Sequence, residues 1–183
     1  FVGTESEPAT GGETSTGYQR NIAVNRVGRM LNTHSHFIET THDFRTELGF
    51  MNRFFRPDIS GIHNRVQLNF FPESLDINSW SATLFDVYLK DLDGTMVYHQ
   101  LGPSLGVSFD TNFFSANYTE YNEVLRPQDF PGITSNRRYD YDDWQLSYGN
   151  STLNSLEFDI SYRSGTTLNL VPAMGNLPSV ADT

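Results

Sequence analysis

Apolar and polar residues alternate along most of this chain. Residues 65–70 read Arg-Val-Gln-Leu-Asn-Phe, and residues 156–163 read Leu-Glu-Phe-Asp-Ile-Ser-Tyr-Arg. Successive side chains of a β-strand point to opposite faces, so this alternation predicts strands with one apolar and one polar face. No stretch sustains the spacing of an amphipathic helix. We therefore predict an all-β protein, an antiparallel meander of about eight to ten strands of ordinary length.

Turn-forming residues separate the alternating runs. Residues 91–94 read Asp-Leu-Asp-Gly between two β-rich segments, so we predict a β-hairpin over residues 79–101. Residues 125–138 contain two prolines and one glycine, which predicts a long loop. Residues 1–17 are polar and rich in Gly, Thr and Glu, so they predict a lead-in or loop before a β-rich segment over residues 18–183.

Residues 43–50 carry the sharpest contrast between the two faces of a strand. One face is aromatic and aliphatic and the other carries three charges in a row: Phe44, Thr46, Leu48 and Phe50 against Asp43, Arg45 and Glu47. Residues 105–114 also read as a single strand, whose apolar face holds Val107, Phe109, Thr111 and Phe113. The architecture depends on which face meets the interior.

Two antiparallel architectures produce such alternation. In a soluble β-sandwich the apolar face points inward and the charged face meets water. In a transmembrane β-barrel the apolar face meets lipid and the polar face lines the lumen. Aromatic residues near the ends of the runs favour the barrel, because aromatic girdles mark its two interfaces with water. These aromatic residues are Phe70, Phe71, Trp80, Phe113, Phe114, Tyr139 and Tyr141.

The barrel interpretation assigns both faces of residues 43–50. Phe44, Leu48 and Phe50 would face lipid. The three charges would face the lumen, where they can stay hydrated or pair with neighbours. An arginine on the lipid face at mid-depth would instead cost on the order of 2–4 kcal/mol.

Composition limits the partners and the chemistry. The 183 residues include 12 Lys and Arg against 22 Asp and Glu, a net charge of −10, so nucleic acid is not an expected partner. Cysteine is absent, which excludes disulfides, thiolate metal sites and cysteine nucleophiles. The chain starts at Phe1 and ends without a recognisable terminal element, so we expect a piece of a longer polypeptide.

Two histidines form the only candidate metal site suggested by spacing. His34 and His36 are two residues apart, so they share a strand face, and His42 and Asp43 follow shortly. Two such histidines can share a metal ion, with a carboxylate completing the ligand set. A polar strand face without metal is the simpler interpretation, and we predict no cofactor. Residues 91–94 resemble the start of a calcium loop but lack its later acidic ligands, so they predict a turn.

Acidic and aromatic residues suggest a weaker link to sugars. Asp140, Asp142 and Asp143 form an acidic run in which Asp140 and Asp142 share one strand face and Asp143 lies on the other, and paired carboxylates are what a glycosidase requires. Trp80 and Trp144 could stack on sugar rings, although core or interfacial anchoring is the more common role of such residues. Acidic runs are abundant in acidic proteins, so we do not expect an enzyme.

The run from His42 to Pro72 resembles a recurring segment of a bacterial outer-membrane family catalogued as domain of unknown function 5916. The resemblance rests on Asp-Phe-Arg at residues 43–45, on Glu-Leu-Gly-Phe at residues 47–50 and on Arg53. Residues 139–165 are similar to paired strands further along that family. The resemblance implies a C-terminal β-barrel, in chains that often carry a carbohydrate-binding family 9-like domain ahead of the barrel. The family supplies no catalytic residues.

From these observations we predict a segment of an outer-membrane β-barrel of a Gram-negative bacterium. Its partners would be membrane lipid and a glycan or small solute that passes along the polar lumen. The alternative is a soluble β-sandwich that binds carbohydrate. A third hypothesis, a glycan-acting enzyme that uses the Asp140–Asp143 cluster, ranks below both.

Overall fold

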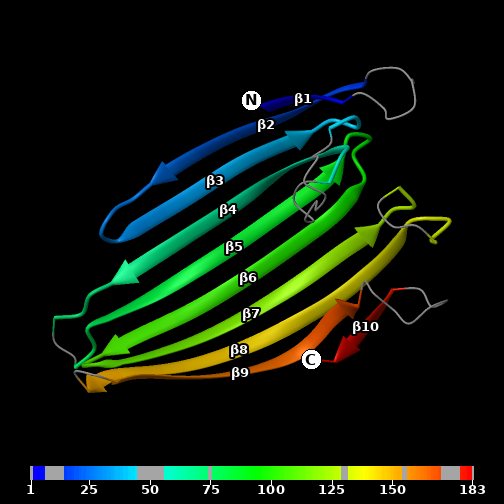
Figure 1. Cartoon of the computed structure of the whole chain (residues 1–183). Helices are drawn as coiled ribbons and strands as arrows, with labels where there is room; N and C mark the ends of the chain where they lie inside the picture. The colour runs from blue at the N-terminus through cyan, green and yellow to red at the C-terminus, as the bar shows by residue number, and fades with distance from the viewer. Residues whose placement is uncertain are drawn as a thin grey trace.

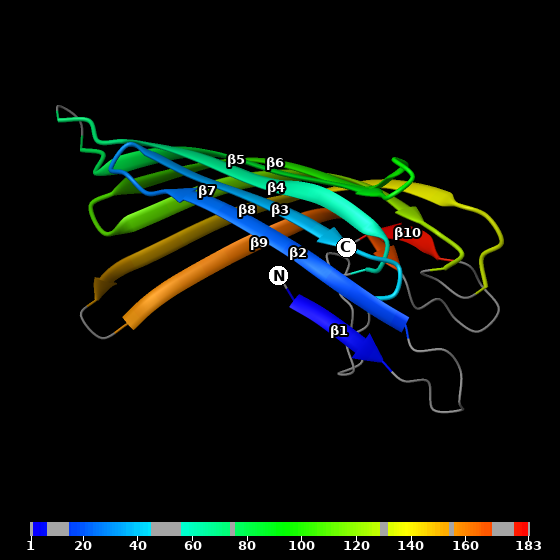
Figure 2. The same ribbon diagram turned by 90° about the horizontal axis from the view of Figure 1, so that it is seen from above.

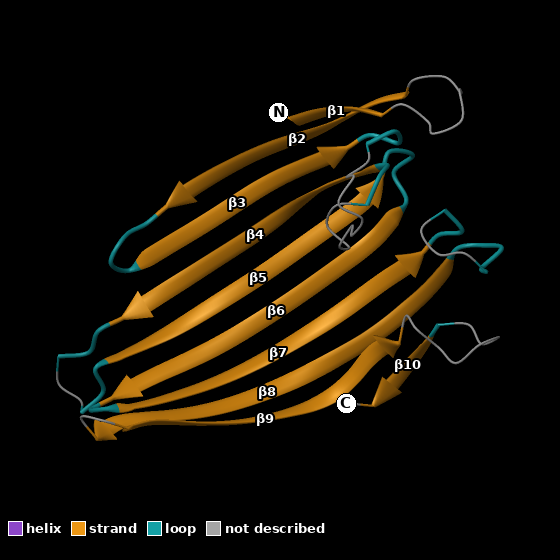
Figure 3. Ribbon diagram, viewed as in Figure 1, coloured by secondary structure: helices purple, strands orange, loops and turns teal. Residues whose placement is uncertain are grey.

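The structure is a computed structural model that describes residues 2–6, 15–44, 56–73, 76–128, 132–153, 156–169 and 178–182. All its regular elements are strands, and each strand pairs antiparallel with the next in the chain to form one sheet (Figures 1 and 3). The predicted all-β antiparallel meander is therefore confirmed. The strands are β1 (Val2–Ser6), β2 (Ser15–Arg26), β3 (Leu31–Thr40), β4 (Ile59–Phe70), β5 (Ser79–Asp91), β6 (Met96–Phe109), β7 (Asn112–Leu125), β8 (Arg137–Leu153), β9 (Leu156–Asn169) and β10 (Ser179–Asp182).

The sheet is curved and open. Seen from above, β2 and β9 lie on the same side of the central strands β5 and β6, so the sheet forms an arch (Figure 2). Among the described residues β1 and β10 do not pair with each other. No helix in this part of the chain is long and apolar enough to cross a bilayer.

One face of the sheet is apolar and exposed. Directly paired residues of antiparallel strands share a face, and from β4 to β9 three consecutive pairing rows on this face contain no charged side chain. We call these rows the apolar belt. Its exposed large side chains are Val66, Leu68, Trp80, Leu84, Leu105, Phe114, Trp144, Leu146, Tyr148, Ile160 and Tyr162.

The opposite face is polar behind the apolar belt. One of its rows runs from Gln67 on β4 through Thr83, Ser104, Asn117 and Gln145 to Arg163 on β9. This face lines a hollow of about 710 Å³ that reaches from β3 to β8, so it is the concave side of the arch. We call this hollow the polar trough.

The buried core occupies one end of the same concave face. Ile38, Ile59, Val87, Leu89 and Tyr98 form its largest cluster, together with Val97. Gly61 lies directly between Ile38 and Leu89 in this cluster. A Cβ atom at Gly61 would lie 2.2 Å from the Tyr88 carbonyl oxygen, so this close packing requires glycine.

Buried charges fasten the segment that precedes β4 to the end of β7. Glu123 is fully buried, accepts a hydrogen bond from the Tyr141 hydroxyl at 3.0 Å and pairs with Arg56. Arg126, which is 2% exposed, donates to the carbonyl oxygens of Pro57 and Asp58 at 3.1 and 3.2 Å. Each buried charge therefore has a hydrogen-bonding partner. Together these contacts hold the segment before β4 against the end of β7, at the core end of the arch.

Several sequence predictions hold in the structure. The hairpin predicted over residues 79–101 is β5 and β6, and Asp91 and Gly94 close its turn with a 3.0 Å backbone hydrogen bond. The loop predicted over residues 125–138 separates β7 from β8. Within the segment predicted as a polar lead-in or loop, residues 1–17, residues 2–6 form β1, which pairs with the start of β2.

Three predictions about individual faces are wrong. Phe44 is not on a lipid-facing strand: β3 ends at Thr40, and Phe44 is buried against Gly17; residues 45–50 lie outside the described part. Phe113 does not share a face with Val107, because a turn at Asp110 ends β6 and Phe113 pairs with Ser108. Two tyrosines predicted for an exposed girdle pack instead with the second buried cluster: Tyr139 and Tyr141.

Candidate functional site: a histidine cluster beside the polar trough

The polar trough presents mainly uncharged hydrogen-bonding groups. Amides and hydroxyls from β5, β6, β7 and β8 line it, and Arg65 supplies a positive charge. Such a surface can exchange hydrogen bonds with water or with a hydroxyl-rich solute. The lining residues are His34, His63, Arg65, Thr83, Phe85, Gln100, Gly102, Pro103, Ser104, Asn117, Tyr118, Thr119 and Gln145.

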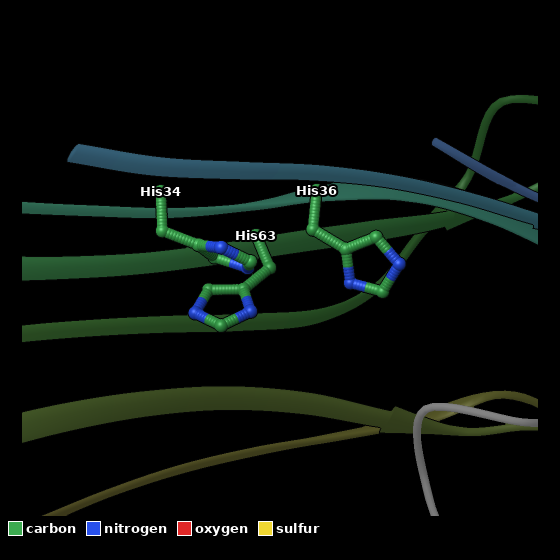
Figure 4. Close-up of side chains that lie close together, drawn as sticks. All are labelled: His34, His36 and His63. Atoms are coloured by element: carbon green, nitrogen blue, oxygen red, sulfur yellow. The ribbon is translucent and has the colours of Figure 1, made fainter. Parts of the chain in front are cut away.

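Three histidines converge on the concave face where β3 meets β4. His34 and His36 lie two residues apart on β3, and His63 lies directly opposite His36 on β4. Their ring centroids are 5.0 Å apart for His34 and His63, 6.0 Å for His34 and His36, and 6.4 Å for His36 and His63. One ring nitrogen from each residue lies within 4.8 Å of the others, and all three side chains project from the same side of their strands (Figure 4).

Two asparagines of β2 orient the β3 histidines. The Asn25 Oδ1 atom lies 2.5 Å from His34 Nδ1, and the Asn21 Oδ1 atom lies 2.5 Å from His36 Nε2. An amide oxygen only accepts hydrogen bonds, so each contact places the proton on the contacted ring nitrogen. In the neutral tautomers that donate to these oxygens, the lone pairs lie on His34 Nε2 and His36 Nδ1.

The third histidine has an unsatisfied nitrogen. His63 Nε2 is the one buried side-chain nitrogen or oxygen without a hydrogen-bond partner in the described part of the chain. The His63 ring packs on Phe85 with centroids 4.7 Å apart, which holds the ring in place. An unpaired buried polar atom costs about 1–3 kcal/mol. The cluster thus contains one ring nitrogen, His63 Nε2, whose lack of a partner lowers stability, beside two histidine rings that asparagines orient.

The candidate histidine pair lies on one strand face as expected, but the third group beside it differs from the one considered. The sequence suggested that a carboxylate would complete the set with His34 and His36. Asp43 instead lies in the turn after β3, and His63 supplies the third ring. Sequence reasoning missed His63 because its distance from β3 depends on strand pairing. Its only signal was its position in the same alternating polar set as Arg65.

The candidate carboxylates do not form a catalytic pair. Asp143 is 6% exposed on the polar face, where it accepts hydrogen bonds from Arg163 at 2.7 Å and from the Tyr121 hydroxyl at 3.2 Å. Asp140 lies on the opposite face in an exposed ion pair with Arg138, at 2.9 Å. Because the sheet separates Asp140 from Asp143, they cannot act as acid and base on one glycosidic bond.

The two tryptophans also occupy separate positions. Both are exposed on the apolar face, at 38% for Trp80 and 53% for Trp144. Trp80 stacks on Phe70 with ring centroids 3.9 Å apart, and Trp144 packs on Tyr118 at 4.6 Å. Trp144 lines a shallow apolar hollow of about 510 Å³ that Trp80 does not reach, so the pair does not form one sugar platform.

Comparisons with protein-family models, curated proteins and solved structures gave no match to this chain. The resemblance of residues 42–72 to an outer-membrane family therefore stays a prediction. What the chain does is argued below from its faces, its charges and its histidine cluster.

Proposed function

We propose that this chain forms part of the wall of a transmembrane β-barrel in the outer membrane of a Gram-negative bacterium. The apolar belt would face lipid, and the polar trough would belong to the lumen. One observation carries the proposal: from β4 to β9, three consecutive rows of the convex face hold mostly large apolar side chains, and the two concave rows between them hold only polar residues and glycine. In a soluble curved sheet the concave side encloses the apolar core, whereas here the core occupies only one end of the concave face.

Exposure supports the same assignment. Leu105 is 59% exposed and Leu146 is 41% exposed, and no described segment covers either of them. Soluble monomers rarely expose contiguous apolar patches larger than roughly a few hundred Å². A β-sandwich would require a second layer over this face. Lipid would cover the belt without a second protein layer.

The two borders of the apolar belt differ in chemistry, one being aromatic and the other polar. Phe70, Trp80, Phe114 and Tyr148 share one pairing row at one border, as an aromatic girdle would. The row at the other border contains Asn64, Asp86, Glu120 and Asp142. Polar groups at that level would meet the headgroups. In the lumen, the amides and hydroxyls of the polar trough would suit a hydroxyl-rich solute such as a glycan fragment.

Adjacent residues on opposite faces provide a direct test. The chain contains no cysteine, so Leu105→Cys and Ser104→Cys each give a single labelling site. Each variant would be folded in lipid vesicles, labelled with an environment-sensitive fluorophore and mixed with brominated lipid. We expect quenching at residue 105 and little at residue 104. Equal quenching at both sites, or a monomer that folds cooperatively in plain buffer, would contradict the membrane assignment and favour the soluble sandwich.

A further inference from the structure

We propose that His34, His36 and His63 bind a divalent transition-metal ion, with Zn²⁺ as the representative. Nothing in the wall function requires such a site. The inference depends only on the pairing of β2, β3 and β4, so it holds whether lipid or water meets the apolar belt. Imidazole nitrogen is a preferred ligand of Zn²⁺, Cu²⁺ and Ni²⁺.

The spacing of the ring nitrogens is close to that of a bound site. Zn–N bonds of about 2.0–2.1 Å place neighbouring nitrogens of a tetrahedral site about 3.3 Å apart. The three nitrogens here lie within 4.8 Å of one another. The rings would have to turn to close this difference, since the three side chains lie on one side of β3 and β4 but the His36 ring is directed away from His34 (Figure 4).

The asparagines supply what metal-binding histidines need around them. A metal-ligating histidine usually donates its second ring N–H to a carboxylate or carbonyl oxygen, which fixes the tautomer and the ring orientation. Asn25 does this for His34, and Asn21 does it for His36. The strand next to the ligands therefore engages one ring nitrogen of each of these two histidines and leaves the other for a metal.

The unsatisfied nitrogen of His63 is the independent sign that a ligand belongs here. His63 Nε2 is shielded from solvent, yet it contacts no hydrogen-bonding group of the described chain. A ligand that reached this lone pair would remove the cost of leaving it unpaired. A merely structural histidine would be expected to have a partner at both ring nitrogens, because buried polar atoms are nearly always hydrogen-bonded.

The positive charge of Arg65 would repel a bound cation, but Arg65 does not occupy any of the three histidine nitrogens. Arg65 lies directly opposite His34 across the β3–β4 pairing. Its guanidinium donates to Gln67 at 2.9 Å, and Gln67 donates on to Asn69 at 2.8 Å, so this chain of hydrogen bonds leads along β4 away from the histidines. Arg65 should therefore weaken the site by repulsion alone.

Three protein nitrogens leave a coordination position open. Structural zinc sites usually have four protein ligands, whereas sites with three keep one position for water or another small ligand. His34 and His63 both line the polar trough, so water or a solute oxygen from the trough would complete the shell. The site should therefore bind an exchangeable ion.

Metal titration of the whole folded chain tests the proposal. The chain would be folded in the medium in which it is stable, treated with a chelator, and titrated with ZnCl₂ against a chromogenic chelator. We expect one Zn²⁺ per chain and a loss of affinity of at least about 100-fold in His63→Ala. His99→Ala is the matched control, since His99 bonds Asp86 at 3.1 Å on the opposite face, and it should bind within about 2-fold of the original chain.

Two further measurements keep the result decisive. His63→Gln preserves the shape of the side chain, so it replaces His63→Ala if circular dichroism shows that the alanine variant is misfolded. X-ray absorption at the zinc edge should count three imidazole ligands. No Zn²⁺ binding by the folded chain, or equal binding by the His63 and His99 variants, would overturn the proposal. Because the titration runs in water or detergent, failure of the membrane assignment would not affect it.

Discussion

His36 lies directly opposite His63 across the pairing of β3 and β4, although residues 41–58 separate the two strands in the chain. This pairing turns two histidines of one strand into a three-membered cluster. It also places the cluster beside the polar trough rather than on the exposed apolar belt. Four predictions follow from the cluster, the belt and the buried charges.

Removal of Asn25 should weaken the metal site without removing a ligand. In Asn25→Ala the His34 ring loses the acceptor for its Nδ1 proton, so both its tautomer and its orientation become free. We expect the Zn²⁺ affinity to fall by about 10- to 100-fold. Chelator competition measures this change. Asn117→Ala, on another strand of the trough, is the control, and an equal loss there would argue against a specific role of Asn25.

Removal of Arg65 should strengthen the same site. Arg65→Gln deletes the positive charge that lies across from His34 and keeps a hydrogen-bonding side chain. We expect the Zn²⁺ affinity to rise by about 2- to 5-fold at low salt, because repulsion between a guanidinium and a divalent ion falls slowly with distance. The difference should shrink as salt screens the charges. Titrations at two ionic strengths would show this, and an affinity that does not change at low salt would refute it.

A charge on the apolar belt should be far more costly than a charge beside it. Leu105→Arg places a guanidinium on the face that we assign to lipid, whereas Ser104→Arg places it in the trough. We expect the belt variant alone to lose about 2–4 kcal/mol of the free energy of unfolding in vesicles. Urea unfolding from lipid vesicles measures both. Similar losses in the two variants would mean that the belt does not meet hydrocarbon.

Loss of a buried carboxylate should destabilise the core end of the arch. Glu123→Ala removes the buried carboxylate that pairs with the Arg56 guanidinium, whose side chain is 12% exposed. Removing one partner of a buried ion pair costs about 3–5 kcal/mol. Asp140→Ala breaks the exposed pair with Arg138 and should cost at most about 1 kcal/mol. Urea unfolding compares them, and equal losses would show that burial does not govern these pairs.

Local alternation was enough to predict the two faces where a strand is continuous. Val66, Leu68 and Phe70 lie opposite Gln67 and Asn69, as expected, because strand geometry sends neighbouring side chains to opposite sides. The prediction failed at Phe113. Asp110, with φ of 49°, begins a tight turn that no glycine or proline announces, and the turn reverses the face of every residue after it.

Buried contacts with distant segments were beyond the reach of the pattern. Tyr141 read as an interfacial aromatic, yet its hydroxyl bonds Glu123 and its ring stacks on Tyr121 with centroids 4.7 Å apart. Phe44 read as lipid-facing, yet it is buried beside Gly17. In both cases the alternating pattern looks the same for an exposed strand end and for a packed one.

The sequence by itself determined an all-β meander and the composition of each strand's two faces, because both follow from contacts between neighbours in the chain. The tertiary structure alone decided which face is concave, which end of that face is packed, and which histidine completes the cluster. Those features depend on strand pairing and on curvature, in which residues far apart in the chain share one row. The physical reason is that alternation records only the two sides of a strand, whereas a site forms where several strands present the same side at the same level.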